Sequence, residues 1–473
     1  LQDLYPRPER LYFLPIGGTA MAPLAGLLQA VGHDVEGVDS GLYPPMSTLL
    51  DELEIPVRIG WDADKIPAGL DRVIIGNAVP RDNPEVAAVL ERGLPFLSQA
   101  EAVAHYVLAR GQSSLVVAGT HGKTTTSSLL AWILEDTGGD PSYLVGGLPG
   151  WNRRGFRLGA GPWMVIEGDE YNTAFFDRGP KFLHYRSHLF ILGPVEYDHA
   201  DLYPSLDAVL TAFRAGAAQV PKAGAVVVNA WSGHGLAAIR DATAPVVAVG
   251  PGTDHDLRMT NWAPSEFGGV CEVSWRGERL LLELPLAGEH NAQNAAVALA
   301  AALTVGVPHR SALAALARFP GVARRMENRG EAGGVLVVDD FAHHPTAVGV
   351  TIAAARQRWP DRRLVIAFEP RSLTAARRDF GAAYLEALGG ADLALVAAPF
   401  HSGRLAEDEV LDRDRLAKEL AERGVATVMP GPDDDPVEVL LPLLRPGDVV
   451  VGCSSGSFDA FHTRLLEALE ASS

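Results

Sequence analysis

One stretch decides the fold expected for this chain: Val116-Val117-Ala118-Gly119-Thr120-His121-Gly122-Lys123-Thr124-Thr125-Thr126. The apolar run that leads into it, Leu115–Ala118, predicts a buried strand, and helix-forming residues continue over Ser127–Leu134. A short turn between a buried strand and a helix is typical of α/β folds. In such folds ligands bind at the carboxyl ends of the strands, so this turn is the first candidate site.

The turn has the composition of a phosphate cradle. Gly119 and Gly122 allow backbone N–H groups to approach an anion, and the N-terminus of the following helix favours negative charge. Lys123 is expected to reach the terminal phosphates, and Thr124 to supply a hydroxyl to the Mg²⁺ of ATP. Because Val117 stands where the usual loop has its first glycine, an ordinary strand–helix connection is the alternative. The residues predicted to bind ATP here are Gly119, Thr120, His121, Gly122, Lys123, Thr124 and Thr125.

Composition indicates a large globular protein of the cytoplasm. Its 473 residues exceed what one compact core accommodates, so three domains are expected. The net charge of −18 argues against nucleic acid as a partner. Only two cysteines occur, Cys271 and Cys453, which excludes a disulfide framework. No signal peptide is recognised, and Ala295–Val307 is too short to span a membrane. We expect no membrane partner, and a monomer or weak homo-oligomer.

The N-terminal residues 1–110 are predicted to form a Rossmann-like domain. The predicted elements are the strand Leu11–Ile16, the helix Met21–Val31 and the strand Val35–Val38. The turn Gly17-Gly18 follows the first strand, and Asp39 ends the second, as in dinucleotide-binding folds. Pro15 replaces the first glycine of that fingerprint, which argues against NAD as a ligand.

Two further α/β domains are predicted, a central one over residues 111–318 and a C-terminal one over residues 319–473. Both alternate apolar runs with helical segments, which indicates doubly wound sheets. The predicted central strands, besides the one before the glycine turn, are Met164–Glu167 and Leu189–Leu192. The predicted C-terminal elements are the strands Val335–Val338, Leu364–Phe368, Leu393–Ala397 and Val449–Gly452 and the helices Ala347–Arg356 and Ala375–Leu388.

Two polar residues follow central strands. Glu167 ends its strand, and His199 comes shortly after Leu189–Leu192, so both could ligate magnesium near the phosphates. The alternatives are a surface strand end for Glu167 and a structural histidine for His199, because Mg²⁺ prefers oxygen ligands. Farther on, Asn291 and Asn294 share a helix face and could bind a base; capping of that helix is the alternative.

The C-terminal region contributes cationic and strand-end residues. Arg325 could bind phosphates, and Asp340 at a strand end could accept from ribose hydroxyls. Arg371, just past another strand, could bind a carboxylate, although an exposed arginine is the commoner outcome. The histidine pair His343-His344 could be only a loop feature.

Together these segments resemble the Mur ligases, the ATP-dependent amide-bond ligases of peptidoglycan metabolism, over nearly the whole chain. The motifs are G-T-H-G-K-T-T at 119–125, E-x-D-E at 167–170, D-H at 198–199, G-E-H-N-x-x-N at 288–294, R-R-x-E at 324–327 and D-D-F-A-H-H-P at 339–345. The resemblance implies an N-terminal UDP-binding domain, a central ATPase domain and a C-terminal domain for the incoming amino acid or peptide.

Within the family the chain resembles the branch that joins UDP-N-acetylmuramate to the recycled murein tripeptide L-alanyl-γ-D-glutamyl-meso-diaminopimelate. Glu170–Asp177 looks like the signature segment of that branch, and Phe341 stands where the L-alanine-adding branch has tyrosine. In and after Pro370–Thr374, Ser372 and Ala375 stand where the L-alanine-adding branch has two substrate-contacting arginines. The alternative is ligation of L-alanine. Ala212–Gly216 contains no lysine, so the carbamylated lysine of other members is expected to be absent.

The resemblance also implies roles for individual residues. Lys123, Glu167, His199 and His343 would be catalytic, with Thr124, Glu167 and His199 holding Mg²⁺. His290, Asn291, Asn294, Arg325 and Asp340 would contact ATP. Arg371, Ser372 and Thr374 would face the peptide, and UDP would contact Gly17, Gly18, Thr19, Asp39 and Asn77. The rival classes are a non-catalytic nucleotide switch and an NAD-dependent oxidoreductase.

Overall fold

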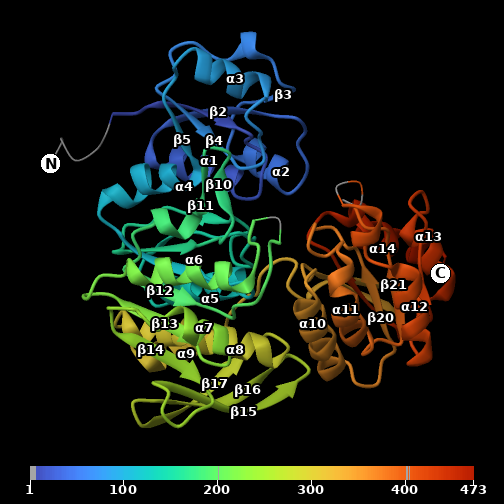
Figure 1. The fold of residues 1–473 in the computed structure, drawn as a ribbon. Helices are drawn as coiled ribbons and strands as arrows, with labels where there is room; N and C mark the ends of the chain where they lie inside the picture. Colours follow the sequence, from blue (N-terminus) through green and yellow to red (C-terminus); the bar gives the residue numbers. More distant parts are fainter. Residues whose placement is uncertain (1–6, 201, 401–402, 404, 473) are drawn as a thin grey trace.

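The computed structural model describes residues 7–200, 202–400, 403 and 405–472. Three α/β units follow one another along the chain, each built on its own sheet (Figure 1). They are called the N-terminal unit (residues 10–110), the middle unit (113–316) and the C-terminal unit (327–471). The expected α/β class with three domains is confirmed.

The N-terminal unit has a parallel sheet of strand order β3-β2-β1-β4-β5. Its strands are β1 (Arg10–Leu14), β2 (Asp34–Asp39), β3 (Val57–Ile59), β4 (Arg72–Ile75) and β5 (Phe96–Ser98). Its helices are α1 (Met21–Val31), α2 (Met46–Glu52), α3 (Pro84–Glu91) and α4 (Gln99–Ala102). The predicted helix Met21–Val31 is confirmed residue by residue, because Gly32 ends it in the left-handed conformation that glycine adopts readily.

The middle unit has a larger sheet of order β17-β16-β15-β14-β13-β12-β6-β9-β7-β8. Its strands are β6 (Ser113–Ala118), β7 (Ser142–Leu144), β8 (Phe156–Arg157), β9 (Trp163–Glu167), β12 (Leu189–Leu192), β13 (Ala225–Asn229), β14 (Val246–Gly250), β15 (Leu257–Ser265), β16 (Gly268–Trp275) and β17 (Glu278–Leu284). Its helices are α5 (Lys123–Asp136), α6 (Leu206–Ala218), α7 (Gly233–Ala238), α8 (Glu289–Thr304) and α9 (His309–Leu316).

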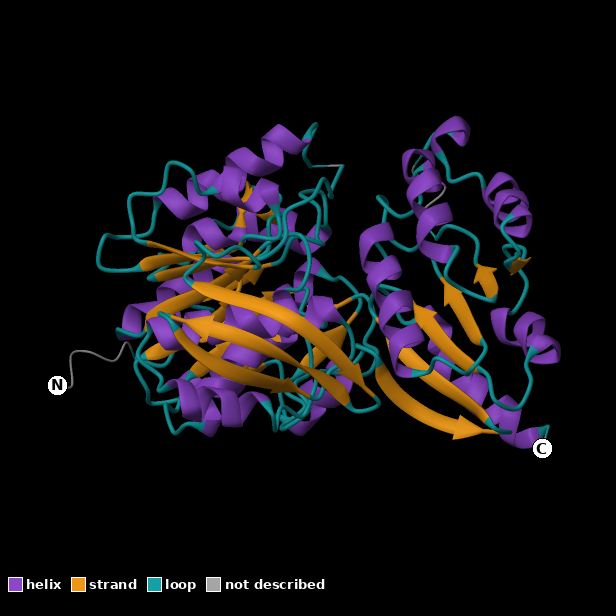
Figure 2. Ribbon diagram, turned by 90° about the horizontal axis from the view of Figure 1, so that it is seen from below, coloured by secondary structure: helices purple, strands orange, loops and turns teal. Residues whose placement is uncertain are grey.

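The strands that carry the candidate site lie at the centre of this sheet. Parallel strand β6 pairs with β12 on one side and with β9 on the other, so their carboxyl ends meet at one edge. Beyond β14 the sheet turns antiparallel through β15, β16 and β17, the long strands in Figure 2. This antiparallel extension was not predicted. A short hairpin, β10 (Asn172–Ala174) and β11 (Asp177–Pro180), follows β9 and forms a separate two-stranded sheet.

The C-terminal unit has a sheet of order β18-β19-β23-β20-β21-β22, parallel except for β18. Its strands are β18 (Glu327–Ala332), β19 (Val335–Asp340), β20 (Leu364–Phe368), β21 (Leu393–Val396), β22 (Ala426–Val428) and β23 (Val449–Cys453). Its helices are α10 (Pro345–Arg358), α11 (Gly381–Leu388), α12 (Arg413–Glu422), α13 (Pro436–Leu440) and α14 (Phe461–Ala471).

The predicted helix Ala375–Leu388 is wrong in its first part, since α11 begins only at Gly381. The preceding residues turn instead. The Ser372 hydroxyl accepts a hydrogen bond from the Ala375 N–H at 3.0 Å, and the Ala376 carbonyl accepts one from the Leu411 N–H at 2.8 Å. These bonds tie the segment to a distant loop, which local helix propensity cannot foresee.

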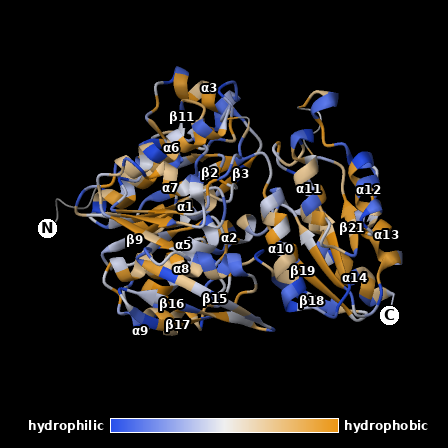
Figure 3. Cartoon of the chain, turned by 60° about the horizontal axis from the view of Figure 1, so that its bottom comes forward, coloured by the Kyte–Doolittle hydropathy of each residue, from blue (hydrophilic) through white to orange (hydrophobic). Residues whose placement is uncertain are grey.

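Apolar residues follow the strands, and polar residues cover the outward surfaces of the helices (Figure 3). One hydrophobic cluster runs from Leu11 and Phe13 of the N-terminal sheet to Phe190 of the middle sheet, so these two units share a core. The clusters of the C-terminal sheet are separate and take only Ala287 from the middle unit. Within the described residues, no helix is both long and apolar enough to cross a membrane.

Candidate active site

The glycine turn between β6 and α5 forms as predicted. Gly119 and Gly122 both have positive φ, +126° and +76°, which only glycine adopts at low cost. Gly119 lies so close to the backbone of Gly193 that a Cβ would be 3.0 Å from it. At the other end, a Cβ on Gly122 would overlap the side chain of Asn294. The helix α5 begins at Lys123, earlier than predicted, so its N-terminal N–H groups border the turn.

Lys123 lies at the centre of the site. Its Nζ donates to the carbonyl of Gly119 at 2.8 Å and to Oε2 of Glu170 at 2.7 Å. Burial disfavours the charge on Lys123, but the carboxylates of Glu170 and Asp169 outweigh it and raise the pKa of the lysine. The ammonium therefore stays charged within the turn.

Glu167, at the end of β9, contacts the residue predicted to share a magnesium ion with it. Its Oε1 accepts from the Thr124 hydroxyl at 2.9 Å, and its Oε2 accepts from the Gly146 N–H at 2.7 Å. Burial, and then the neighbouring charge of Asp169, raise the pKa of the Glu167 carboxyl. A carboxyl whose charge is this poorly compensated is a place where a cation would be stabilised.

His199 lies on the other side of the same cluster. Its Nε2 is 3.3 Å from Oε1 of Glu170, and its own backbone has a positive φ of +52°. Burial lowers the pKa of His199, but the hydrogen bond to Glu170 outweighs it, and the net shift is upward. Likewise, burial raises the pKa of Glu170 but Lys123 and His199 lower it overall. Lys123, Glu170 and His199 thus form one charged row.

These residues fit a magnesium ion. The Thr124 hydroxyl and the Glu167 carboxylate lie 2.9 Å apart and offer oxygen donors, which Mg²⁺ prefers. The buried Oε1 of Glu170 already has a cationic neighbour, since Nε2 of His199 lies 3.3 Å away.

The asparagine pair is drawn together at the start of α8. Asn291 Nδ2 donates to the Ala287 carbonyl at 2.8 Å, and Asn294 Nδ2 lies 3.4 Å from Oδ1 of Asn291. The helix N-cap is Gly288, which has no side-chain cap, so the capping alternative is wrong. Burial and then the charge of Arg325 lower the pKa of His290 to about 4.

The predicted ATP contacts of the C-terminal unit cluster around Phe341. Arg325 lies over the Phe341 ring at 5.0 Å. Asp340 accepts from the Met326 N–H at 2.8 Å and from the Ala342 N–H at 2.9 Å, which fixes the strand end. His343 Nδ1 lies 3.0 Å from the carbonyl of Phe341.

The residues predicted to face the peptide lie together beyond β20. The Arg371 guanidinium stacks over Phe400 at 4.0 Å and lies 3.3 Å from Glu369. Glu369 also accepts from the hydroxyl of Ser454, which brings in the loop after β23. Ser372 forms the turn described above, and Thr374 is buried.

The predicted UDP-binding residues differ in their surroundings. Oδ2 of Asp39 accepts from the Gly17 N–H at 2.8 Å, so the turn and the strand end are in contact. The carbonyl of Gly18 accepts the first backbone bonds of α1. Thr19 and Asn77 are exposed.

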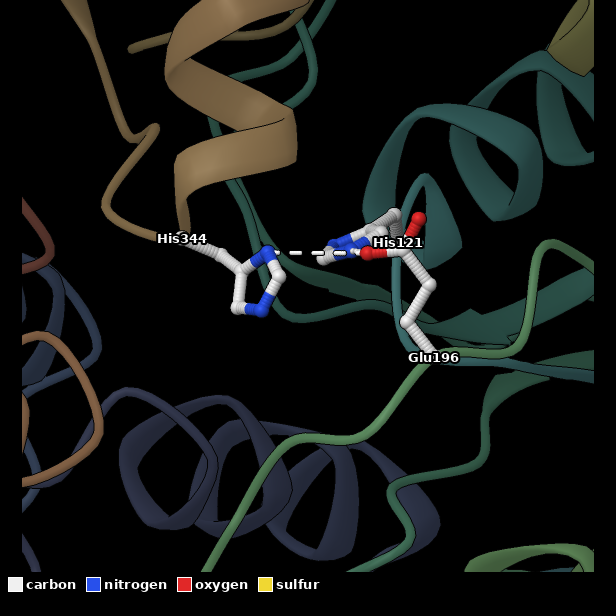
Figure 4. Close-up of side chains that lie close together, drawn as sticks. All are labelled: His121, Glu196 and His344. Atoms are coloured by element: carbon white, nitrogen blue, oxygen red, sulfur yellow. Dashed lines mark hydrogen bonds and ion pairs between the residues drawn. The ribbon is translucent and has the colours of Figure 1, made fainter. Parts of the chain in front are cut away.

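A second charged cluster connects the middle and C-terminal units (Figure 4). Oε2 of Glu196 lies 3.1 Å from Nε2 of His121 and accepts from the Thr346 hydroxyl at 2.7 Å. Nδ1 of His344 is 3.7 Å from the same oxygen. The bond to His121 lowers the pKa of Glu196 to about 2, while burial and then His121 lower the pKa of His344 to about 4.

Comparison with known proteins agrees with this geometry. Three family models match: the Mur ligase family catalytic domain at residues 10–110, the Mur ligase middle domain at 164–302 and the Mur ligase glutamate ligase domain at 324–456. The UDP-N-acetylmuramate–L-alanyl-γ-D-glutamyl-meso-2,6-diaminoheptandioate ligase of Escherichia coli is 37% identical, over 97% of this chain and 98% of that protein.

The chain belongs to the Mur ligase family. It is therefore an ATP-dependent ligase of cell-wall metabolism. The crystal structure of a murein peptide ligase from Psychrobacter arcticus aligns with a TM-score of 0.75 and 31% identity, covering 98% of this chain and 99% of that one. A UDP-N-acetylmuramate–L-alanine ligase of Solidesulfovibrio magneticus is 34% identical over 97% of this chain and 98% of that protein.

Sequence reasoning overlooked Glu170 and Glu196 as site residues of this Mur ligase. Glu170 was only the last letter of the E-x-D-E motif, yet it links Lys123 to His199. The sequence did contain a signal for Glu170, because a second carboxylate three residues after Glu167 can lie at the same end of the sheet. Glu196 gave no signal, since its partners lie 75 and 150 residues away in sequence.

Proposed function

We propose that this Mur ligase uses ATP to join UDP-N-acetylmuramate to the tripeptide L-alanyl-γ-D-glutamyl-meso-diaminopimelate. The observation that carries the proposal is the 37% identity, over nearly the full length of both chains, to the Escherichia coli ligase named for that reaction. The Psychrobacter arcticus murein peptide ligase supports it with a second full-length similarity above 30%. Such an activity would serve the recycling of peptidoglycan.

In this proposal each part of the chain holds one substrate. Residues 1–110 take the UDP-sugar, residues 111–318 take ATP, and residues 319–473 take the peptide. The shared core of the first two parts supports a fixed arrangement of sugar nucleotide and ATP. The separate core of the third part suits a unit that brings the peptide to them.

The chemistry would run in two steps. The lactyl carboxylate of UDP-N-acetylmuramate attacks the γ-phosphorus of ATP, which forms an acyl phosphate and releases ADP. The free amine of the peptide then attacks the acyl carbon, and phosphate leaves. The difficulty is to place a carboxylate against a polyanion, so most of the catalysis is positioning and charge neutralisation.

The chain's own residues supply that neutralisation. Lys123, held by Gly119 and Glu170, presents a permanent positive charge at the turn. Thr124, Glu167 and His199 would hold magnesium, which neutralises phosphate charge when it is bound. Arg325 would approach the nucleotide from the C-terminal unit, where Phe341 supports its guanidinium.

The incoming peptide would meet a different set of residues. Arg371, in contact with both Glu369 and Phe400, offers a guanidinium for a peptide carboxylate. Ser372 and Thr374 lie beside it in sequence and carry hydroxyl groups, and His343 follows β19, which is separated from β20 by β23. This set differs from the arginine-rich pocket that the L-alanine-adding branch is expected to have.

The experiment is a turnover assay with purified protein, MgATP and UDP-N-acetylmuramate, in which the tripeptide and L-alanine are offered separately. We expect ADP release and the mass of the UDP-N-acetylmuramyl tripeptide only with the tripeptide. Product with L-alanine alone would replace the proposal by the L-alanine ligase activity. ATP hydrolysis that needs neither sugar nucleotide nor peptide would defeat both.

A further inference from the structure

We propose that His121, Glu196 and His344 form a transition-metal site that joins the ATP-binding turn to the C-terminal unit. The three side chains come from three different segments: the turn before α5, the loop after β12 and the residue that caps α10. Their nearest ligand atoms all lie within 4.8 Å of one another. Figure 4 shows the two imidazole rings pointing toward the Glu196 carboxylate.

The distances suit one ion bound by all three residues. Zinc bonds to histidine nitrogen and carboxylate oxygen are about 2.0–2.2 Å, so neighbouring ligand atoms of a tetrahedral site lie about 3.3–3.5 Å apart. The observed separations from Oε2 of Glu196 are 3.1 Å to Nε2 of His121 and 3.7 Å to Nδ1 of His344. The two histidine nitrogens lie within 4.8 Å of each other.

The chemistry of the three ligands distinguishes this site from the magnesium site. Two imidazoles and one carboxylate suit zinc and similar ions, whereas Mg²⁺ prefers oxygen ligands alone. The residues assigned to magnesium are Thr124, Glu167 and His199, and none of them belongs to this set. Three protein ligands leave a fourth tetrahedral position for water.

Neighbouring groups hold the ligands in place. The Thr346 hydroxyl donates to Oε2 of Glu196 at 2.7 Å. The backbone of Glu196 is fixed by Thr120, whose hydroxyl donates to its carbonyl at 3.1 Å and accepts from its N–H at 3.0 Å. Partners of this kind orient metal ligands and increase affinity.

His344 turns Nδ1, and not Nε2, toward Glu196. Its side chain is buried, 7% exposed, and its Nε2 forms no hydrogen bond with any described residue. The bond from the Thr346 N–H to Nδ1 is long, 3.4 Å, and would yield to a metal. The ring contacts His121 at 4.8 Å and Phe380 at 5.4 Å, so packing rather than hydrogen bonding places it.

A bound ion would connect two units that otherwise have separate cores. His121 belongs to the turn predicted to bind ATP, and His344 begins the first helix of the C-terminal unit. Zinc would therefore stabilise the contact between these units and slow any turnover that requires them to separate. We therefore expect zinc to inhibit turnover when MgATP is saturating.

The test uses the full-length protein with Mg²⁺ present and zinc as the probe. Calorimetric titration of the wild type is expected to show one zinc site. The zinc affinity of that site should fall by at least about 100-fold in Glu196→Gln and in His344→Asn. Asparagine is chosen because it can still cap α10. The matched control is His309→Asn, since His309 lies 3.3 Å from Glu278 in a pair to which the described residues add no third metal ligand.

Cobalt adds a readout that is independent of enzyme activity. Co²⁺ bound by the wild-type protein and by His309→Asn should show the visible absorption of a four-coordinate site, and both other variants should lack it. Circular dichroism and metal-free thermal unfolding confirm that the variants are folded. The proposal is overturned if Glu196→Gln and His344→Asn bind zinc like the wild type, or if the wild type gives no four-coordinate cobalt spectrum.

Discussion

Lys123 shows what can and cannot be learned from a single residue in the sequence. Its place after the second glycine predicted a charged group in a phosphate-binding turn, and the structure puts it there. Its ion-pair partner Glu170 lies 47 residues later, on the loop after β9. That pairing depends on the order of strands in the sheet, which local patterns do not encode.

Replacing Lys123 with alanine should reduce ADP formation by at least about 100-fold, since it removes the positive charge that faces the phosphates. It also removes one of the two cationic partners of the buried Glu170, since His199 remains, and we expect the free energy of unfolding to fall by up to about 3–5 kcal/mol. The measurements are ADP release, chemical denaturation, and calorimetric binding of UDP-N-acetylmuramate, which should persist.

The control for that variant is Lys222→Ala, because Lys222 is exposed. It should match the wild type in both turnover and stability. A Lys123→Ala enzyme that kept more than a tenth of the wild-type rate would show that the turn does not serve ATP as proposed.

At the level of elements, the sequence predicted the central parallel strands and the main helices, but it did not predict several further strands. The strand Leu364–Phe368 and the helix Met21–Val31 have the predicted bounds, since each is a continuous apolar or helix-period run with clear ends. The strand β18 was missed because Glu327–Ala332 is polar and pairs at a sheet edge with one face exposed. The long strands β15 to β17 were missed although their buried and exposed residues alternate, because exposed charged residues such as Arg258, Glu272 and Glu283 interrupt the continuous apolar runs on which the strand predictions rested.

The turn that starts α5 gives a sharp test at this level. Gly122→Ala places a methyl group against the side chain of Asn294 and requires a positive φ of +76°. We expect about 1–3 kcal/mol of destabilisation and weaker binding of MgATP. Thermal unfolding and calorimetry measure the two effects.

Gly233→Ala is the matched control, because Gly233 starts α7 with no atom near its missing Cβ and no positive φ. Its stability should be unchanged or slightly higher, as expected for alanine in a helix. Equal effects of the two substitutions would contradict the structural account of the turn.

In the whole molecule, two units share a core and the third has clusters of its own. The apolar cluster that includes Phe13 and Phe190 makes the N-terminal and middle units one body. Glu196 and Thr346 form one of the contacts that link the C-terminal unit to it. The sequence motifs predicted three regions, but which of them pack together depends on surfaces that no motif describes.

The thiol reactivity of the two cysteines should report separately on the unfolding of the middle unit and of the C-terminal unit. Cys271 lies in β16 and Cys453 in β23, and both are buried. Burial, and then Glu289, raise the pKa of Cys271 to about 12, and burial also raises that of Cys453. Only the thiolate reacts, so at pH 8 the folded protein should react at least about 100-fold more slowly than the unfolded protein.

The measurement is labelling with a thiol reagent along a denaturant titration, with the modified cysteine identified by mass spectrometry. Reactivity should rise when unfolding returns each pKa toward its ordinary value, and the two sites should appear at different denaturant concentrations if the units open separately. Rapid labelling of either cysteine in the native protein at pH 8 would contradict its placement.

The β10–β11 hairpin has a consequence for communication along the molecule. It begins two residues after Glu170, Thr173 accepts from the Ala100 N–H at 3.2 Å, and Phe176 packs against Phe96 at 4.9 Å. The sheet that would receive the sugar is therefore linked to the carboxylate beside Lys123 by a very short piece of backbone. A movement of this segment when either ligand binds would change the affinity for the other ligand, and by thermodynamic linkage the two changes would be equal.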